Sequence, residues 1–177
     1  IIKPAENAPR ATFAMAEACQ EAGIPAGVVN VVTGEPGFIS EYLIKSDVIR
    51  KVTLTGSVPI GRLLYKYAAE EIKSVSMELG GHSPVLVFED ANVEEAARMC
   101  ARGKFRNNGQ VCISASRFIV QESVAEKFTE YFVDETRRIK MGEGSDPETE
   151  IGPLENARRL EAAHNLVQDA VQKGAKV

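Results

Sequence analysis

Several features that would assign this chain to a special class are missing from it. Its 177 residues contain only three cysteines, Cys19, Cys100 and Cys112, and none of them has the CxxC spacing of a zinc or redox motif. An odd count without paired spacing excludes a disulfide framework, so we expect reduced thiols. The two histidines, His82 and His164, have no partner at ligand spacing, and we predict no metal site.

Long apolar runs and basic clusters are equally scarce. The longest apolar runs, 27–32 and 84–88, fall far below the roughly 20 residues that cross a bilayer, and we see no secretory signal pattern. Lysine and arginine number 21 against 25 acidic residues, so no basic surface suits nucleic acid. Because 44% of the residues are hydrophobic, a packed core is available. We therefore expect a cytoplasmic protein with neither a membrane nor a nucleic-acid partner.

Strand and helix patterns alternate along the chain. Short β-branched or apolar segments indicate strands at 28–32, 51–55, 75–79, 84–88 and 117–121. Segments of helical period predict helices at 10–22, 38–45, 60–71, 93–105, 123–138 and 154–173. The four valines within 28–32 are typical of a parallel strand covered on both faces. This alternation predicts an α/β fold with parallel sheets, and the diglycine Gly80-Gly81 is the best candidate boundary.

Two segments have the residue types of nucleotide-binding turns. In Thr55-Gly56-Ser57, followed by Gly61, a strand ends in glycine where a helix begins, and this is a layout that can cradle a phosphate. An ordinary strand-to-helix turn explains the same residues. Lys3 and Glu6 place a cation and a carboxylate three residues apart, where both can hold a ribose diol. The alternative is a solvated ion pair.

Two further segments are candidates for catalysis. Glu78 stands among apolar residues before the diglycine, and burial there would raise its pKa toward that of a useful base. A surface carboxylate is an equal alternative. In segment 105–112, amides and a glycine interrupt a helix-to-strand connection that ends in Cys112. Residues that contradict the local structural preference in this way are typical of functional sites. Cys19 and Cys100 lie in alanine-rich helices, where cysteine usually acts as a small apolar residue.

These last two segments together resemble the active-site signatures of the aldehyde dehydrogenase superfamily. The matching residues are Glu78-Leu79-Gly80-Gly81 and Phe105-x-Asn107-x-Gly109-Gln110-x-Cys112. Other motifs follow in the family's order: Lys3-Pro4-Ala5-Glu6, Gly23-Ile24-Pro25-x-Gly27-Val28-x-Asn30, Thr55-Gly56-Ser57, Asp90-Ala91-Asn92 and Ile151-Gly152-Pro153-Leu154. His82 departs slightly from the family pattern, which often has lysine or asparagine there.

The resemblance implies a covalent mechanism and a nicotinamide cofactor. Cys112 would attack the aldehyde, and Glu78 would activate the water that hydrolyses the resulting thioester. The family pattern assigns cofactor binding to Lys3, Glu6, Gly56, Ser57 and Leu79. A carboxylate at Glu6 accepts a bond from a free 2′-hydroxyl and repels a 2′-phosphate, so we expect NAD in preference to NADP.

Arg106 resembles the arginine with which succinate-semialdehyde dehydrogenases hold the far carboxylate of the substrate. A guanidinium fork suits a carboxylate and contributes nothing toward an apolar aldehyde. The resemblance thus implies a small-molecule partner, a semialdehyde such as succinate semialdehyde. A surface arginine at the end of a helix is the alternative.

The resemblance also implies a domain organisation. Residues 1–79 would form the C-terminal half of a Rossmann-like NAD-binding domain, and 80–177 the first part of a second, catalytic α/β domain, with the active cleft between them. The chain looks like an internal fragment without its complete oxyanion cradle, so we expect the isolated polypeptide to be inactive and the full-length protein to be a dimer or tetramer. A relative that acylates coenzyme A or reduces an acyl phosphate, and a binding protein with a decayed site, are the rival interpretations.

Overall fold

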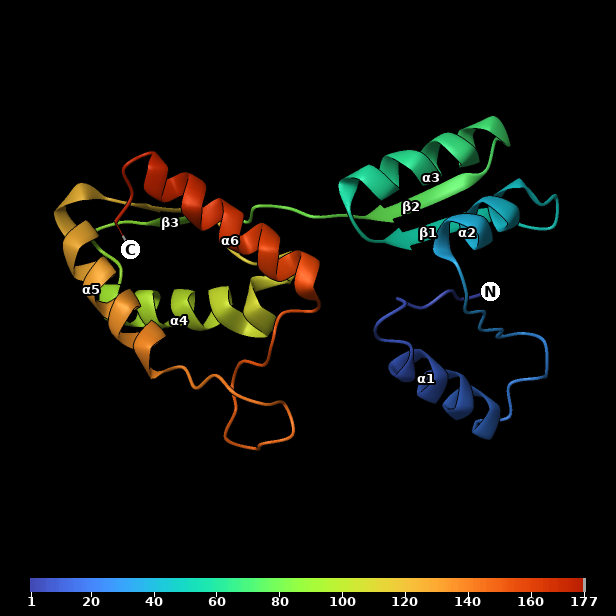
Figure 1. Cartoon of the computed structure of the whole chain (residues 1–177), viewed down its shortest axis with the longest axis horizontal. Coiled ribbons are helices and arrows are strands. Elements are labelled where there is room, and N and C mark those ends of the chain that lie inside the picture. Colours follow the sequence, from blue (N-terminus) through green and yellow to red (C-terminus); the bar gives the residue numbers. More distant parts are fainter. Residues whose placement is uncertain (177) are drawn as a thin grey trace. The chain divides into compact units, whose positions relative to one another are not determined.

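The structure is a computed structural model that describes residues 1–176, in which helices alternate with short parallel strands (Figure 1). It divides into two compact units, Ile1–Leu79 and Gly80–Val177. In chain order the elements are α1 (Arg10–Glu21), α2 (Pro36–Lys45), β1 (Lys51–Thr55), α3 (Val58–Glu70), β2 (Ser74–Glu78), β3 (Val85–Val87), α4 (Val93–Phe105), η1 (Arg106–Gly109), β4 (Phe118–Val120), α5 (Glu122–Arg138) and α6 (Ala157–Gln172). The predicted α/β fold class is confirmed.

The first unit contains one strand–helix–strand crossover, in which α3 connects the parallel strands β1 and β2. Its buried core consists of Ile44, Leu64 and Ala68. The strand register places Thr55 opposite Glu78 at the carboxyl ends of both strands. The N–H of Gly56 continues this pairing and donates to the Glu78 carbonyl at 3.0 Å. The Gly56-Ser57 turn and Glu78 therefore lie at the same edge of this sheet, the edge at which α/β folds bind ligands.

The second unit packs α4 and α5 together with the parallel strands β3 and β4. Its buried core consists of Val87, Val93, Ala97 and Phe128. As the sequence predicts, Asn92 caps α4: its side-chain oxygen accepts from the N–H of Glu95 at 3.3 Å. The two helices are also joined by an ion pair, since Nε of Arg102 lies 2.5 Å from the buried carboxylate of Glu135. This ion pair and the core hold α4 firmly where the candidate site begins.

The strand predicted from the valines of 28–32 is wrong. Within residues 1–176 the segment forms a single parallel bridge, between Ile2 and Val31. The N–H of Ile2 donates to the backbone carbonyl of Asn30 at 2.7 Å, and the N–H of Val32 donates to the backbone carbonyl of Ile2 at 3.0 Å. Val28 is 63% exposed and therefore not covered on both faces. A β-branched segment becomes a strand only when neighbouring strands pair along it, and the described residues supply one bridging residue.

The last helix begins three residues later than its pattern predicts. Asn156 caps α6, and its side-chain oxygen accepts from the N–H of Arg159 at 3.1 Å. Because asparagine favours the N-cap position over the helix interior, the helix begins at Ala157. The segment 151–154 is thereby left outside the helix.

Residues 1–176 offer neither a membrane-spanning helix nor a metal-binding cluster. No helix there combines the length and the apolar character that crossing a lipid bilayer requires. No group of three or more His, Cys, Asp or Glu side chains in this part of the chain has a geometry that could hold a metal ion.

Candidate functional site

The segment after α4 follows a left-handed backbone path. Asn107, Asn108 and Gly109 have φ angles of 51°, 56° and 72°. Residues other than glycine rarely adopt this backbone conformation. Asparagine tolerates it because its side-chain amide can hydrogen-bond locally. The amides and glycine that interrupt the helical pattern are therefore the residue types that this path requires.

The side chain of Asn108 connects this loop to a distant segment. Its amide nitrogen donates to the carbonyl of Gly152 at 2.8 Å and to that of Pro153 at 3.1 Å. A second bond joins the same two segments: the side-chain amide oxygen of Gln110 accepts from the backbone N–H of Glu155 at 3.4 Å. The Ile151-Gly152-Pro153-Leu154 motif thus supports the loop from outside, a role that the sequence did not reveal.

Cys112 lies exposed in the tight turn that follows. The N–H of Ser114 donates to the carbonyl of Val111 at 3.0 Å, so that Cys112 and Ile113 are the central residues of the turn. The buried hydroxyl of Ser114 donates to the carbonyl of Lys104 at 3.2 Å and joins the turn to the end of α4. Sequence reasoning missed Ser114; a small polar residue two positions after the cysteine was the available signal.

The other two cysteines have different surroundings. Cys100 packs against the core of the second unit, and burial raises the pKa of its thiol. Cys19 is half-buried on α1. A raised pKa lowers the thiolate fraction, and the thiolate is the nucleophile. Among these three thiols, Cys112 is the exposed one.

Arg106 lines a cavity of about 310 Å³ in the second unit. The wall also includes Val111, Ile113 and Ser114, which surround Cys112 in the sequence, although Cys112 itself is not part of the wall. The remaining lining residues are mostly apolar: Val85, Met99, Cys100, Gly103, Lys104 and Ala115. An apolar wall with a guanidinium at its edge suits an aliphatic chain that ends in a carboxylate.

Glu78 ends strand β2 and is exposed. Of the two alternatives that the sequence leaves open, the structure therefore shows the exposed carboxylate and not one buried in the strand. The physical reason is its register: Glu78 is the last paired residue, opposite Thr55, so its side chain lies where the sheet ends. An exposed carboxylate at a strand end is open to water and to small molecules.

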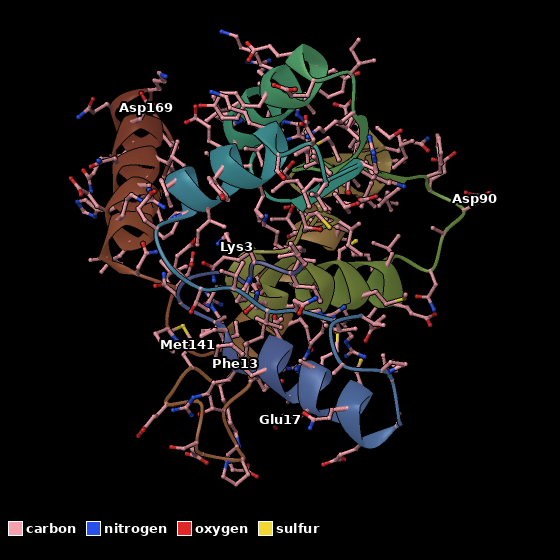
Figure 2. The ribbon with its side chains drawn as sticks, turned by 90° about the vertical axis from the view of Figure 1, so that its right-hand side faces the viewer. Lys3, Phe13, Glu17, Asp90, Met141 and Asp169 are labelled. Atoms are coloured by element: carbon pink, nitrogen blue, oxygen red, sulfur yellow. The ribbon has the colours of Figure 1, made fainter. Side chains whose placement is uncertain are left out.

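Lys3 and Glu6 form the predicted pair. The Nζ of Lys3 lies 2.6 Å from a carboxylate oxygen of Glu6, and this hydrogen bond lowers the pKa of the Glu6 carboxyl. Both residues line a cavity of about 290 Å³, and Phe13 of α1 forms part of its wall. Figure 2 labels Lys3 and Phe13. A cation and a carboxylate at one cavity can bind the hydroxyls of a ribose.

The start of α3 has the geometry of a phosphate site. Ser57 is the N-cap of α3, but its side chain does not cap the helix, so the hydroxyl is not occupied by the first turn. Gly61 is buried under Leu79, and a Cβ added at Gly61 would lie 2.7 Å from Cδ2 of Leu79. The glycine therefore lets Leu79 cover the first turn of the helix. Gly56, Ser57 and Leu79 are thus gathered around one helix N-terminus, which suits a diphosphate.

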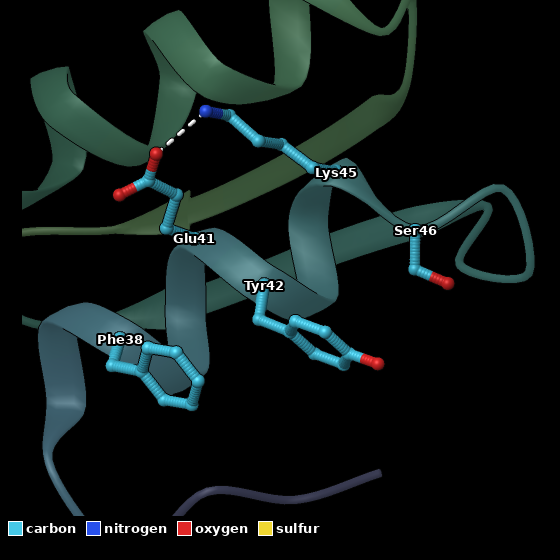
Figure 3. Close-up of a pocket in the computed structure, with 5 residues that line it drawn as sticks. All are labelled: Phe38, Glu41, Tyr42, Lys45 and Ser46. Atoms are coloured by element: carbon cyan, nitrogen blue, oxygen red, sulfur yellow. Dashed lines mark hydrogen bonds and ion pairs between the residues drawn. The ribbon is translucent and has the colours of Figure 1, made fainter.

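A larger cavity, of about 440 Å³, lies on α2 in the first unit. Figure 3 shows Phe38 and Tyr42 on one side of the helix, while Glu41 reaches Lys45 on another. The two aromatic rings stack with centroids 6.0 Å apart and are both mostly exposed. Nothing in the sequence predicts a cavity here, because helical spacing alone does not distinguish a buried from an exposed face.

His82 joins the diglycine segment to the start of β4. Its Nδ1 lies 2.9 Å from the hydroxyl of Ser116, and the N–H of Ser116 donates to the His82 carbonyl at 3.0 Å. The hydroxyl of Ser116 also lies 2.9 Å from that carbonyl, to which it can only donate. His82 therefore serves as a connecting residue between these two segments.

Replacing Gly109 with alanine is expected to destabilise the protein by about 1 to 2 kcal/mol, because φ is positive there and only glycine adopts it without strain. A Cβ would also lie 3.2 Å from the carbonyl oxygen of Lys104. Urea unfolding measures the change. The matched control is Gly103→Ala, in the last turn of α4 with nothing within 4 Å of its Cβ position, where alanine should be neutral or stabilising. Equal effects at both glycines would contradict the account of the loop.

Comparison with known proteins supplies an independent finding. The sequence profile described as "Aldehyde dehydrogenase family" matches residues 1–177. The chain is 42% identical, over its whole length, to 37% of a "Succinate semialdehyde dehydrogenase" from Acinetobacter baylyi. It is 40% identical, also over its whole length, to 37% of an Escherichia coli succinate-semialdehyde dehydrogenase whose name specifies NADP(+).

The fold is similar to that of solved structures. A crystal structure described as an NAD-dependent aldehyde dehydrogenase from Sinorhizobium meliloti matches 98% of this chain with a TM-score of 0.95 and 37% identity, and the match covers 35% of that chain. The present chain therefore spans little more than a third of the length of these relatives.

Proposed function

Because the chain belongs to the aldehyde dehydrogenase family, we propose that it supplies the nucleophile, the base and part of the cofactor site of an enzyme that oxidises a semialdehyde to a carboxylic acid. The observation that carries the proposal is the exposed thiol of Cys112, in a turn fixed by the left-handed loop before it and by Ser114 after it. Relatives named as semialdehyde dehydrogenases support the substrate class.

In the proposed reaction, Cys112 acts first. Its thiolate attacks the aldehyde carbon, and the carbonyl π electrons move to oxygen to give a thiohemiacetal. A nicotinamide cofactor held by residues of the first unit would supply the acceptor for the hydride that leaves this carbon. The carbonyl re-forms, and the acyl group remains on the cysteine sulfur as a thioester.

Glu78 acts in the second half of the reaction. Its carboxylate takes a proton from water, the hydroxide oxygen adds to the thioester carbon, and the C–S bond breaks to release the acid. Its exposed position at the end of β2 supports this role, because a water-activating base must be reached by solvent. Cys112 returns to the thiolate for the next cycle.

The cofactor is proposed to be NAD, held by residues of the first unit. Lys3 and Glu6 would bind the adenosine ribose at their shared cavity, and Ser57 would hold the diphosphate beside Gly56 at the start of α3. Leu79, which packs over Gly61, would form an apolar part of the same cofactor site. The ionised carboxylate of Glu6 supports NAD, since it accepts from a 2′-hydroxyl and repels a 2′-phosphate.

The substrate is proposed to be a short aldehyde with a carboxylate at its far end, bound by Arg106. Arg106→Ala in the complete gene product should raise KM for succinate semialdehyde by about 10- to 100-fold, the usual value of a charge-assisted hydrogen bond. KM for the neutral aldehyde butanal should change little.

The control for this prediction is Arg98→Ala, which removes an exposed arginine of α4 whose partner is Glu94. Steady-state kinetics with both aldehydes distinguish the variants. An Arg106→Ala variant that affects succinate semialdehyde no more than butanal would disprove the assigned substrate class.

A further inference from the structure

The first turn of α2 is capped by an acidic side chain of the protein itself. Glu35 is the N-cap residue, and one of its carboxylate oxygens accepts from the N–H of Gly37 at 2.9 Å while the other accepts from the N–H of Phe38. A Cβ on Gly37 would lie only 3.2 Å from the carboxylate, so the glycine leaves room for it. The N–H groups that would otherwise attract an anion are thus already occupied.

This capped turn adjoins the cavity of Lys3 and Glu6. Thr33 and Gly34 form part of the wall of that cavity, and Glu35 is the next residue in the chain. The charges of Glu6 and Lys3 both act on the pKa of the Glu35 carboxyl, while the two backbone N–H groups lower it most. The Glu35 carboxylate therefore lies close enough to Glu6 and Lys3 for their charges to interact.

The charges around the cavity do not balance. Lys3 is paired with Glu6 at 2.6 Å, so its positive charge is already compensated. The groups that hold Glu35 are backbone N–H groups, which carry no formal charge. A second anion at this cavity would meet an uncompensated carboxylate and a helix N-terminus without vacant donors.

We propose that Glu35 is a specificity-determining residue that excludes a 2′-phosphate from this cavity and so reinforces the choice of NAD over NADP. The inference rests on the proposed function, which places the adenosine ribose between Lys3 and Glu6. It adds a second carboxylate to the one at Glu6, at a helix cap that directly follows the wall residues Thr33 and Gly34. As a general scale, a dianionic phosphate that comes within about 6 Å of a carboxylate loses about tenfold in affinity, even at the dielectric constant of water.

The test compares two nucleotides that differ only by the 2′-phosphate, 2′,5′-ADP and 5′-AMP. Glu35→Ser removes the charge but keeps a side chain that can cap α2. Calorimetric titration of the complete gene product should give a Kd for 2′,5′-ADP about tenfold lower in the variant, with the Kd for 5′-AMP unchanged. The ratio of kcat/KM for NADP to that for NAD should rise by a similar factor.

Glu41→Gln is the matched control, because it removes one carboxylate from the same helix, where Glu41 pairs with Lys45 at 2.5 Å and caps nothing. It should leave the ratio of the two Kd values unchanged. Glu35→Gln, which has the original side-chain size, replaces the serine variant if that variant does not fold. An unchanged ratio, or equal weakening of both nucleotides, in the Glu35 variant would overturn the inference. Failure of the wild type to bind 5′-AMP would instead overturn the proposed cofactor site.

Discussion

Cys112→Ser is expected to lower kcat/KM for succinate semialdehyde by at least about 1,000-fold, because a serine hydroxyl remains protonated where a cysteine is partly thiolate. The two side chains are close in size, so the turn between Val111 and Ser114 should persist. Binding of 5′-AMP should be unchanged, since no residue of the second unit is assigned to the nucleotide. NADH absorbance measures the loss.

The other cysteines provide the controls for this result. Cys19→Ser should retain turnover within about threefold. Cys100→Ser should still form NADH, but its KM can change, because Cys100 also lines the cavity of Arg106. Cys100 is the more demanding control, because it is half-buried against the core and its thiol has a raised pKa. Loss of turnover in Cys100→Ser with full turnover in Cys112→Ser would make Cys100 of α4 the nucleophile and contradict the proposal.

Glu78→Gln is expected to separate the two halves of the reaction. The glutamine has the same shape but cannot take a proton from water, so steady-state turnover should fall by about 100- to 10,000-fold. The first turnover does not need the base, so a burst of about one NADH per active site should remain. Stopped-flow measurement of NADH shows both phases.

Glu71→Gln is the matched control, because Glu71 is another exposed glutamate of the same unit, at the end of α3. It should leave both phases unchanged. A Glu78→Gln variant that loses the burst as well would show that Glu78 is not a base for hydrolysis alone. An unchanged steady state that accelerates with coenzyme A would favour the acyl-transfer alternative.

The unusual residues of the active segment could be located from the sequence because they contradict local preferences. Asn107, Asn108 and Gly109 are poor helix formers at the end of a helical pattern, and the structure shows the left-handed path that selects them. Their partners could not be predicted. The bond from Asn108 to Gly152 joins residues far apart in the chain, and such contacts depend on how a loop packs.

The strands show more clearly that long-range contacts could not be predicted from the sequence. The helix after Asn92 was predictable, because capping and helical period are local properties of the chain. The strand expected at 28–32 was not formed, because β-propensity is expressed only where a neighbouring strand pairs with it. The exposure of Glu78 also depends on the register between β1 and β2, which is a property of the strand pair and not of either strand alone.

The most direct measurement is mass spectrometry of the acyl-enzyme in the Glu78→Gln form of the complete gene product, after succinate semialdehyde and NAD are added and the reaction is quenched in acid. The account predicts a succinyl group on the peptide that contains Cys112, and no such group when NAD is omitted. A succinyl group on the peptides of Cys19 or Cys100, or its absence from all three cysteines while NADH has formed, would contradict it.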